Sequence, residues 1–248
     1  MTEWRIIQLE EHDAYSNMGI DESILEHIRD EKSDPTIRFY RWKPSAVSIG
    51  RFQSMNDEIN VSRCKSEGID FVRRITGGGA VYHDYEGELT YSIIGSEKLF
   101  PKSIWESYRM ICGRVVNGLK RIKIEAQFAP INDILLNGKK ISGSAQTRKE
   151  GVLLQHGTIL YKLDVAKMFS VLNVSKEKVS DKMIKNVEER VTSVYSQRAV
   201  SFQELYEAIV YGMTEYREHK FGVLSGSEAT RARDLARTYA TDDWNFSR

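Results

Sequence analysis

The sequence predicts an α+β protein, with mixed, largely antiparallel sheets and flanking helices. Two observations carry this prediction. Short β-rich runs and helical runs interleave along the 248 residues without a regular strand–helix–strand rhythm. Two of the β-rich runs are joined by Asn137-Gly138, the dipeptide typical of a tight hairpin turn. Because 41% of the residues are apolar, the chain can bury a core, and we expect a single domain over residues 1–248.

In the first half of the chain, runs of β-branched and aromatic residues alternate with helical periodicity. A helix is expected from Ala14 onward, because Met18, Ile20 and Ile24 fall at helical spacing and Ser16 or Asn17 could cap its start. A second helix is expected over residues 60–67. Strands are predicted at residues 4–9, 36–41, 46–49, 71–74 and 89–94.

The second half begins with the longest helix candidate, residues 103–122, whose apolar side chains recur every three or four positions. The hairpin follows, with strands at 134–136 and 139–142. The run from Val152 to Leu160 predicts two strand segments separated by Gly157, and residues 164–239 are mostly helical in pattern.

The overall composition bears on partners and location. The net charge is +1, from 36 basic and 35 acidic residues, which gives no electrostatic reason to expect a nucleic acid or an anionic membrane as partner. No apolar run approaches the length of a membrane span, and no signal segment is present, so we expect a cytoplasmic protein. Cys64 and Cys112 lack the spacing of a disulfide framework or a zinc site.

A glycine cluster follows the strand predicted at 71–74. Gly77, Gly78 and Gly79 allow a tight turn and a close approach to a ligand, and successive backbone N–H groups there can hold an anion. Arg74 can bind a carboxylate or phosphate. The spacing matches neither the dinucleotide-binding fingerprint nor the phosphate-binding loop of nucleotide hydrolases. An ordinary hairpin loop with a structural His83 stays open as the alternative.

Three later segments carry polar side chains that could join the same site. Asp133, after Asn132, could hold Mg²⁺ beside phosphates, although a simple turn explains the pair equally well. In the hairpin, Lys139 and Lys140 should point to opposite faces, so that one could stabilise charge in a pocket. His156, ahead of a glycine, could line the same cavity or be structural.

Together these segments resemble the lipoate–protein ligase family, within the broader group that includes biotin ligases and octanoyltransferases. The residues that carry the resemblance are R-R-I-T-G-G-G-A-V-Y-H-D (73–84), N-D (132–133), G-K-K-I-S-G-S-A (138–145) and H-G-T-I-L (156–160), with weaker matches at 17–22, 38–42 and 239–245.

The resemblance implies ATP-dependent activation of lipoate to lipoyl-AMP with Mg²⁺, then transfer to a lysine of a lipoyl carrier domain of a 2-oxoacid dehydrogenase or a glycine-cleavage H-like protein. It implies Lys140 as the catalytic residue and Asn132 and Asp133 beside the ATP phosphates and metal. The residues implied to bind lipoate or its adenylate are Arg74, Thr76, Gly77, Gly78, Gly79, His83, Lys140, Ser142, Gly143, Ala145 and His156.

Two departures from the family pattern leave alternatives open. The chain stops where the small C-terminal accessory domain of many ligases would begin, so we expect that domain to be absent here, with a separately encoded small subunit as a candidate partner. Octanoyltransferases of this group hold the acyl group on a cysteine upstream of the K-x-x-G segment, and residues 125–133 contain none. We therefore expect the ligase. A transferase using Cys112 or Cys64 without ATP, a non-catalytic lipoyl-group binder and, more distantly, a biotin ligase are the alternatives.

Overall fold

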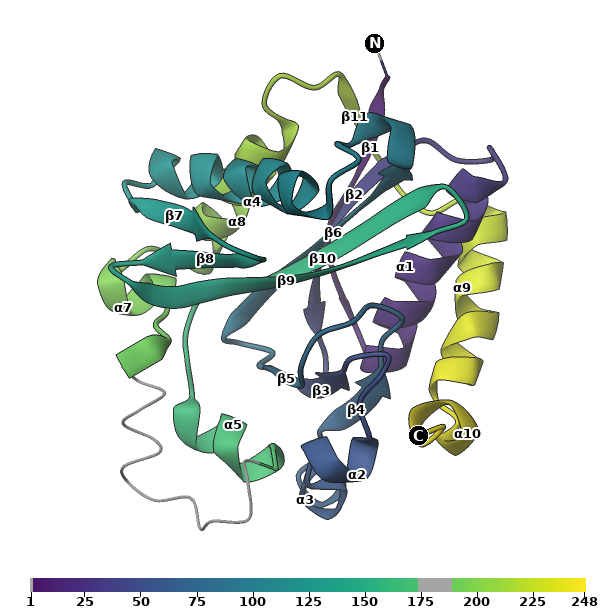
Figure 1. Ribbon diagram of the computed structural model, residues 1–248, viewed down its shortest axis with the longest axis vertical. Coiled ribbons are helices and arrows are strands. Elements are labelled where there is room, and N and C mark those ends of the chain that lie inside the picture. The colour runs from purple at the N-terminus through teal and green to yellow at the C-terminus, as the bar shows by residue number, and fades with distance from the viewer. Residues whose placement is uncertain (1, 174–188) are drawn as a thin grey trace.

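The computed structural model describes residues 2–173 and 189–248, and two sheets organise them (Figure 1). The larger sheet has the order β11-β1-β2-β6-β10-β9-β8-β7, and the smaller has the order β4-β3-β5. The pairs β11–β1 and β1–β2 are parallel, whereas the rest of the large sheet is antiparallel. The strands are β1 (Trp4–His12), β2 (Thr36–Trp42), β3 (Ala46–Ile49), β4 (Asp70–Arg73), β5 (Val81–His83), β6 (Glu88–Ser96), β7 (Ala126–Ala129), β8 (Asp133–Leu136), β9 (Lys139–Lys149), β10 (Val152–Leu160) and β11 (His219–Gly222).

Helices cover both faces of the large sheet. The helices are α1 (Ala14–Arg29), α2 (Met55–Glu58), α3 (Val61–Ser66), α4 (Ile104–Arg121), α5 (Val165–Val171), α7 (Val194–Gln197), α8 (Phe202–Thr214), α9 (Gly226–Tyr239) and α10 (Asp242–Asn245), with a 3₁₀ turn at Glu97–Leu99. Neighbouring strand residues join different cores, because successive side chains point to opposite faces. Ile93 packs in the cluster with α4 and α8, whereas Ile94 packs in the cluster with α1 and α9. Figure 1 shows α1 and α9 side by side on one side of the sheet.

The hairpin that joins β8 to β9 follows from its turn chemistry. Asn137 and Gly138 have φ values of 51° and 76°, the conformation that the Asn-Gly signal predicts. A β-bulge follows in the ladder, where Leu135 pairs with Lys140 but Ile134 pairs with Ser142. The bulge changes the direction of the side chains around Lys140, which places this lysine in the candidate site described below.

The structure confirms the predicted fold class and corrects several boundaries. Asp13, not Ser16 or Asn17, caps α1, and its side chain accepts a hydrogen bond from the Ser16 N–H. The run from Val152 to Leu160 is one continuous strand, because Gly157 sits inside the ladder opposite Tyr91. Residues 219–222 form a strand that the helical prediction for 164–239 missed, and residues 174–188 of that prediction lie outside the described part.

In the described part of the chain, no helix is both long and apolar enough to cross a bilayer.

Candidate active site

A cavity of about 320 Å³ lies between the two sheets, at the loop that joins β4 to β5. Its walls come from β3 and β5 of the small sheet, from β6, β10 and β9 of the large sheet, and from the glycine loop, residues 74–80. Most of the residues predicted for the site line this cavity. They are Arg74, Gly78, Gly79, His83, Asn132, Lys140, Ser142, Gly143, Ala145 and His156. Thr76, Gly77 and Asp133 do not line it but contact residues that do.

Arg74 organises the glycine loop from beneath. Its guanidinium donates hydrogen bonds to the main-chain carbonyls of Gly77 and Gly79, both at 2.8 Å. Gly78, between them, has a φ of 99°, and a Cβ there would lie 2.8 Å from Arg74 Nη2. The middle glycine is therefore required both by the backbone conformation and by the space that the guanidinium occupies.

Arg74 is a buried cation without a carboxylate partner within the described residues. Its remaining hydrogen bonds go to neutral oxygens of Thr76 and Ser48. Burial lowers the pKa of Arg74 to about 10, so the group stays charged at neutral pH. An uncompensated charge of this kind favours a ligand that carries, or develops, negative charge in the cavity.

Two histidines line the cavity, and each contacts a buried carboxylate on one side and a hydroxyl on the other. His83 Nδ1 lies 2.7 Å from Glu88 Oε1, and its Nε2 lies 2.8 Å from Ser48 Oγ. His156 Nδ1 lies 3.4 Å from Asp21 Oδ2, and its Nε2 lies 2.7 Å from Thr76 Oγ1.

The surroundings of the His156–Asp21 pair determine its charges. Burial lowers the pKa of His156, more than Asp21 raises it, so His156 is neutral at physiological pH. Burial would raise the pKa of Asp21, but the hydrogen bond from His156 and the charge of Arg38 hold it below its usual value.

Lys140 lies over a glycine beside the cavity. A Cβ on Gly143 would meet Lys140 Cε and Nζ at 2.9 Å, so the absent side chain makes room for the ammonium group. Lys140 Nζ pairs with Asp133 Oδ1 at 2.7 Å. Both side chains are partly exposed, which makes this end of the cavity accessible to a second molecule.

Asn132 and Asp133, the residues predicted to lie beside ATP phosphates and Mg²⁺, contact β9 and Lys140 in the structure. The Asn132 amide donates to the Ser144 carbonyl, and the Asp133 carboxylate pairs with Lys140. The pair thus organises the β8–β9 edge and orients Lys140.

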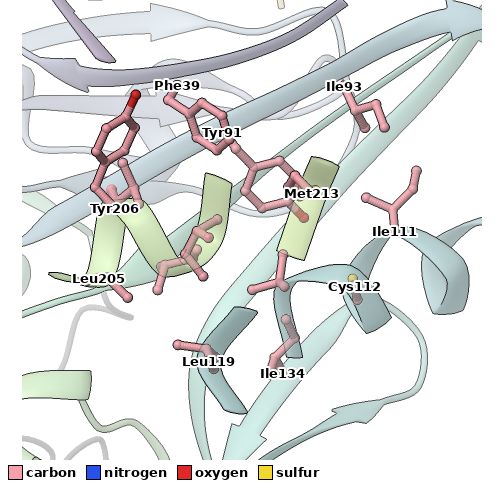
Figure 2. Close-up of a cluster of buried hydrophobic side chains, with 14 of the residues drawn as sticks. Phe39, Tyr91, Ile93, Ile111, Cys112, Leu119, Ile134, Leu205, Tyr206 and Met213 are labelled. Atoms are coloured by element: carbon pink, nitrogen blue, oxygen red, sulfur yellow. The ribbon is translucent and has the colours of Figure 1, made fainter. Parts of the chain in front are cut away.

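Neither cysteine lines the cavity. Cys112 lies on α4 in the core cluster that includes Val115, and Figure 2 shows it on the same helix as Ile111 and Leu119. Burial raises the pKa of its thiol to about 11, which disfavours the thiolate. Cys64 is buried on α3, and burial likewise raises its pKa to about 11. The expectation that Cys112 packs in the core is confirmed.

Sequence reasoning missed several polar cavity residues. Ser48 is the one polar residue of β3, and Glu88 is the one charged residue of β6. A polar or charged residue in such a buried strand is the available signal, because burying it requires a partner. Trp42 stacks on His83, with ring centroids 4.0 Å apart, and lies in the segment 38–42 that carried a weaker family match.

Residues 13–214 match the family described as the lipoyl protein ligase A/B catalytic domain, and the chain belongs to this family. This confirms the family-level resemblance read from the sequence.

Relatives of known function correct the more specific prediction. The octanoyltransferase LipM of Brevibacillus brevis is 37% identical and that of Clostridioides difficile 36% identical, and each alignment covers 100% of both chains. Among solved structures, the bi-partite lipoate protein ligase of Thermoplasma acidophilum, described with its E2 lipoyl domain, is similar with a TM-score of 0.90 and 32% identity. That match covers 99% of this chain and 97% of the other.

The prediction of an ATP-dependent lipoate–protein ligase is therefore wrong, because the curated relatives over the full chain are octanoyltransferases. The expected ATP binding, Mg²⁺ requirement and acyl-adenylate lose their support with it. The prediction rested on Asn132-Asp133 and on the missing upstream cysteine. The coarser conclusion stands: the chain is an enzyme of the lipoyl and octanoyl transfer family.

Proposed function

We propose that this protein transfers an octanoyl or lipoyl group from a carrier-protein thioester to a lysine of a lipoyl carrier domain, without ATP. The full-length similarity to octanoyltransferases supports the reaction class. The lipoyl domain described with the Thermoplasma acidophilum ligase supports the acceptor class. The observation that carries the proposal is the cavity itself, with Lys140 over Gly143 at its accessible end.

The chemistry asks little of the protein beyond positioning and charge stabilisation. The acceptor amine attacks the thioester carbonyl, a C–N bond forms, the C–S bond breaks, and the amine proton ends on the released thiol. A thioester is already activated, so no nucleotide is consumed. The Lys140 ammonium would stabilise the negative charge that develops on the carbonyl oxygen. Ser142 Oγ, buried and without a hydrogen-bond partner among the described residues, lines the same cavity and could bind the acyl carbonyl.

We infer that no cysteine carries the acyl group between donor and acceptor. The chain contains only Cys64 and Cys112, and both are buried outside the cavity with raised pKa values. A thiol nucleophile needs access and thiolate character, and neither side chain has both. Direct attack in a complex of donor, enzyme and acceptor needs only the cavity and Lys140.

The test is octanoyl transfer by the purified chain from an octanoylated acyl carrier protein to a lipoyl domain, in nucleotide-free buffer, followed by mass spectrometry. We expect octanoylation of one acceptor lysine, and loss of transfer in Lys140→Met. The matched control is Lys139→Met, because Lys139 is the adjacent lysine and does not line the cavity. No transfer by the wild type would end the proposal.

The doubly substituted variant Cys64→Ser/Cys112→Ser separates the two chemical routes. Direct attack predicts transfer at the wild-type rate. A folded double variant without transfer would show instead that a cysteine carries the acyl group. A separately encoded small subunit stays a prediction from the sequence, tested by whether transfer by the single domain of residues 1–248 rises when that subunit is added.

A further inference from the structure

A continuous hydrogen-bond network runs beneath the glycine loop. Arg74 stands at its centre, bonded to Ser48 on one side and to Thr76 on the other. Ser48 contacts His83, which contacts Glu88. On the other side the chain continues from Thr76 to His156 and Asp21, which is 2% exposed. Two histidine–carboxylate pairs from distant strands and helices therefore meet on one guanidinium.

The carboxylates determine which way each hydrogen bond in this network points. An ionised carboxylate only accepts, so the ring nitrogen that faces it, Nδ1, must carry the proton. A neutral histidine then presents a bare Nε2, which accepts from the hydroxyl of Ser48 or Thr76. Each hydroxyl, with its proton committed to a histidine, turns its lone pairs toward the Arg74 N–H groups. The direction from guanidinium to carboxylate is thus the same in both branches.

Arg74 in turn determines which way the loop amides point. It holds the carbonyls of Gly77 and Gly79 toward itself. Both following peptide bonds are trans, and in a trans peptide the N–H of the next residue points opposite to the carbonyl. The N–H groups of Gly78 and Ala80 therefore point away from Arg74. No hydrogen-bond partner for either group occurs within residues 2–173 and 189–248, and both residues line the cavity.

We propose that Glu88 and Asp21 are positioning residues that fix the orientation of Arg74. Glu88 acts through His83 and Ser48, and Asp21 acts through His156 and Thr76. Arg74 then holds the glycine loop so that the N–H groups of Gly78 and Ala80 donate to the reacting acyl oxygen. The assignment rests on the proposed acyl transfer and deepens it. Preorganised backbone donors of this kind stabilise the charge of a tetrahedral intermediate without reorganising during the reaction. The buried charge of Arg74, directly behind the loop, strengthens the same effect.

The kinetic test uses Glu88→Gln, Ser48→Ala and the double variant, with Glu11→Gln as the control. Glu11 accepts hydrogen bonds from Lys43 Nζ and the Tyr85 hydroxyl, and it does not line the cavity. Loss of a whole donor of this kind costs about 100-fold or more in kcat. Misorienting the N–H groups of Gly78 and Ala80 should therefore lower kcat by about ten-fold, with KM changing by less than about two-fold. The double variant should lose no more than the single variants, because both changes break one branch.

A merely structural role predicts a different set of results. It would lower thermal stability additively and leave kcat of the folded fraction unchanged, and that result would overturn the proposal. An equal fall in kcat for Glu11→Gln would overturn it as well. The imidazole ¹⁵N spectrum provides a second reading, since His83 and His156 should both be Nδ1–H tautomers in the wild type. Finding either as the Nε2–H tautomer would contradict the direction of the network.

Octanoate binding tests the positioning network independently of acyl transfer. The octanoate carboxylate imitates the charged acyl oxygen, so Ser48→Ala and Glu88→Gln should weaken its binding, measured by calorimetry, by about ten-fold. If the wild type transfers no acyl group while this loss of affinity and the tautomers are found, acyl transfer fails and the positioning network stands. Unchanged octanoate affinity in both variants would overturn the network.

Discussion

Substituting Gly143 by alanine tests the role of Lys140 without touching the lysine. The new Cβ would lie 2.9 Å from Lys140 Cε and Nζ, whereas ordinary van der Waals contact begins near 3.4 Å. The ammonium group must therefore move by about half an ångström. A misplacement of about 1 Å at a reacting centre can cost about 100-fold in rate, so half that distance predicts a fall in kcat of about ten-fold.

The stability of the same variant should change in the opposite direction. Gly143 lies within β9, and its φ is not positive, so alanine restricts the unfolded chain and gains about 0.5–1 kcal/mol. Only the flexible end of a lysine side chain has to give way. We therefore expect Gly143→Ala to lose activity in the octanoyl-transfer assay while its melting temperature holds or rises.

Gly157→Ala is the contrasting variant on the same cavity wall. Its Cβ would lie 2.6 Å from the hydroxyl oxygen of Tyr91, a fully buried ring that cannot move aside. Overpacking of this kind costs about 1–3 kcal/mol, so this variant should melt earlier. Full kcat in Gly143→Ala would contradict a role for Lys140 position, and so would a loss of kcat that only follows a loss of stability. A further fall in the residual rate when Gly143→Ala is added to Lys140→Met would contradict it too, because the substitution would then act on something other than Lys140.

Three more predictions concern stability and the loop. Burial raises the pKa of Glu228, but hydrogen bonds led by those from Arg5 lower it from 4.5 to about 2. The resulting stability of about 3 kcal/mol is complete above pH 4.5 and disappears as the pH falls toward 2, so acid unfolding should flatten in Glu228→Gln. Arg73→Lys should detach α10, because the Arg73 guanidinium donates to carbonyls of α10 and of the loop after β3 at the same time, and a lysine ammonium lacks this planar set of donors. Limited proteolysis of this variant should then cut α10 first. Gly78→Ala should abolish octanoate binding, since its φ and the Arg74 guanidinium both exclude a side chain.

The local elements that sequence predicts best are those with local causes. The helix predicted over residues 103–122 spans Ile104–Arg121, with Ser103 accepting from Glu106 N–H as its cap. The Asn137-Gly138 turn follows from two positive φ values that other residues resist. The strand β11 was missed because its four residues owe their conformation to parallel pairing with β1, more than 200 positions away in sequence.

The residues of the candidate site fall into the same two groups, those that local sequence predicts and those that only the tertiary fold brings together. The motif residues of the glycine loop, of β9 and of β10 do meet at one cavity, since each motif includes residues whose type the backbone requires. Ser48 and Glu88 carry no motif, and their part in the site exists only because β3 and β6 come from different sheets that face each other across His83. The residue pattern within one segment cannot reveal which side chains from a distant segment it will contact in the folded protein.

The mistaken ligase prediction has an instructive physical cause. The lack of a cysteine in residues 125–133 was read as evidence for ATP chemistry, as though an acyl group must reach the acceptor either as an adenylate or through an enzyme thioester. A carrier thioester makes both unnecessary, because the amine can attack it directly once the carbonyl is held and its developing charge is stabilised. Lys140 at one end of the cavity and the outward N–H groups of the glycine loop at its wall are donors suited to that task. Under the proposed direct attack, holding the two substrates together in the cavity takes the place of an enzyme-bound acyl group.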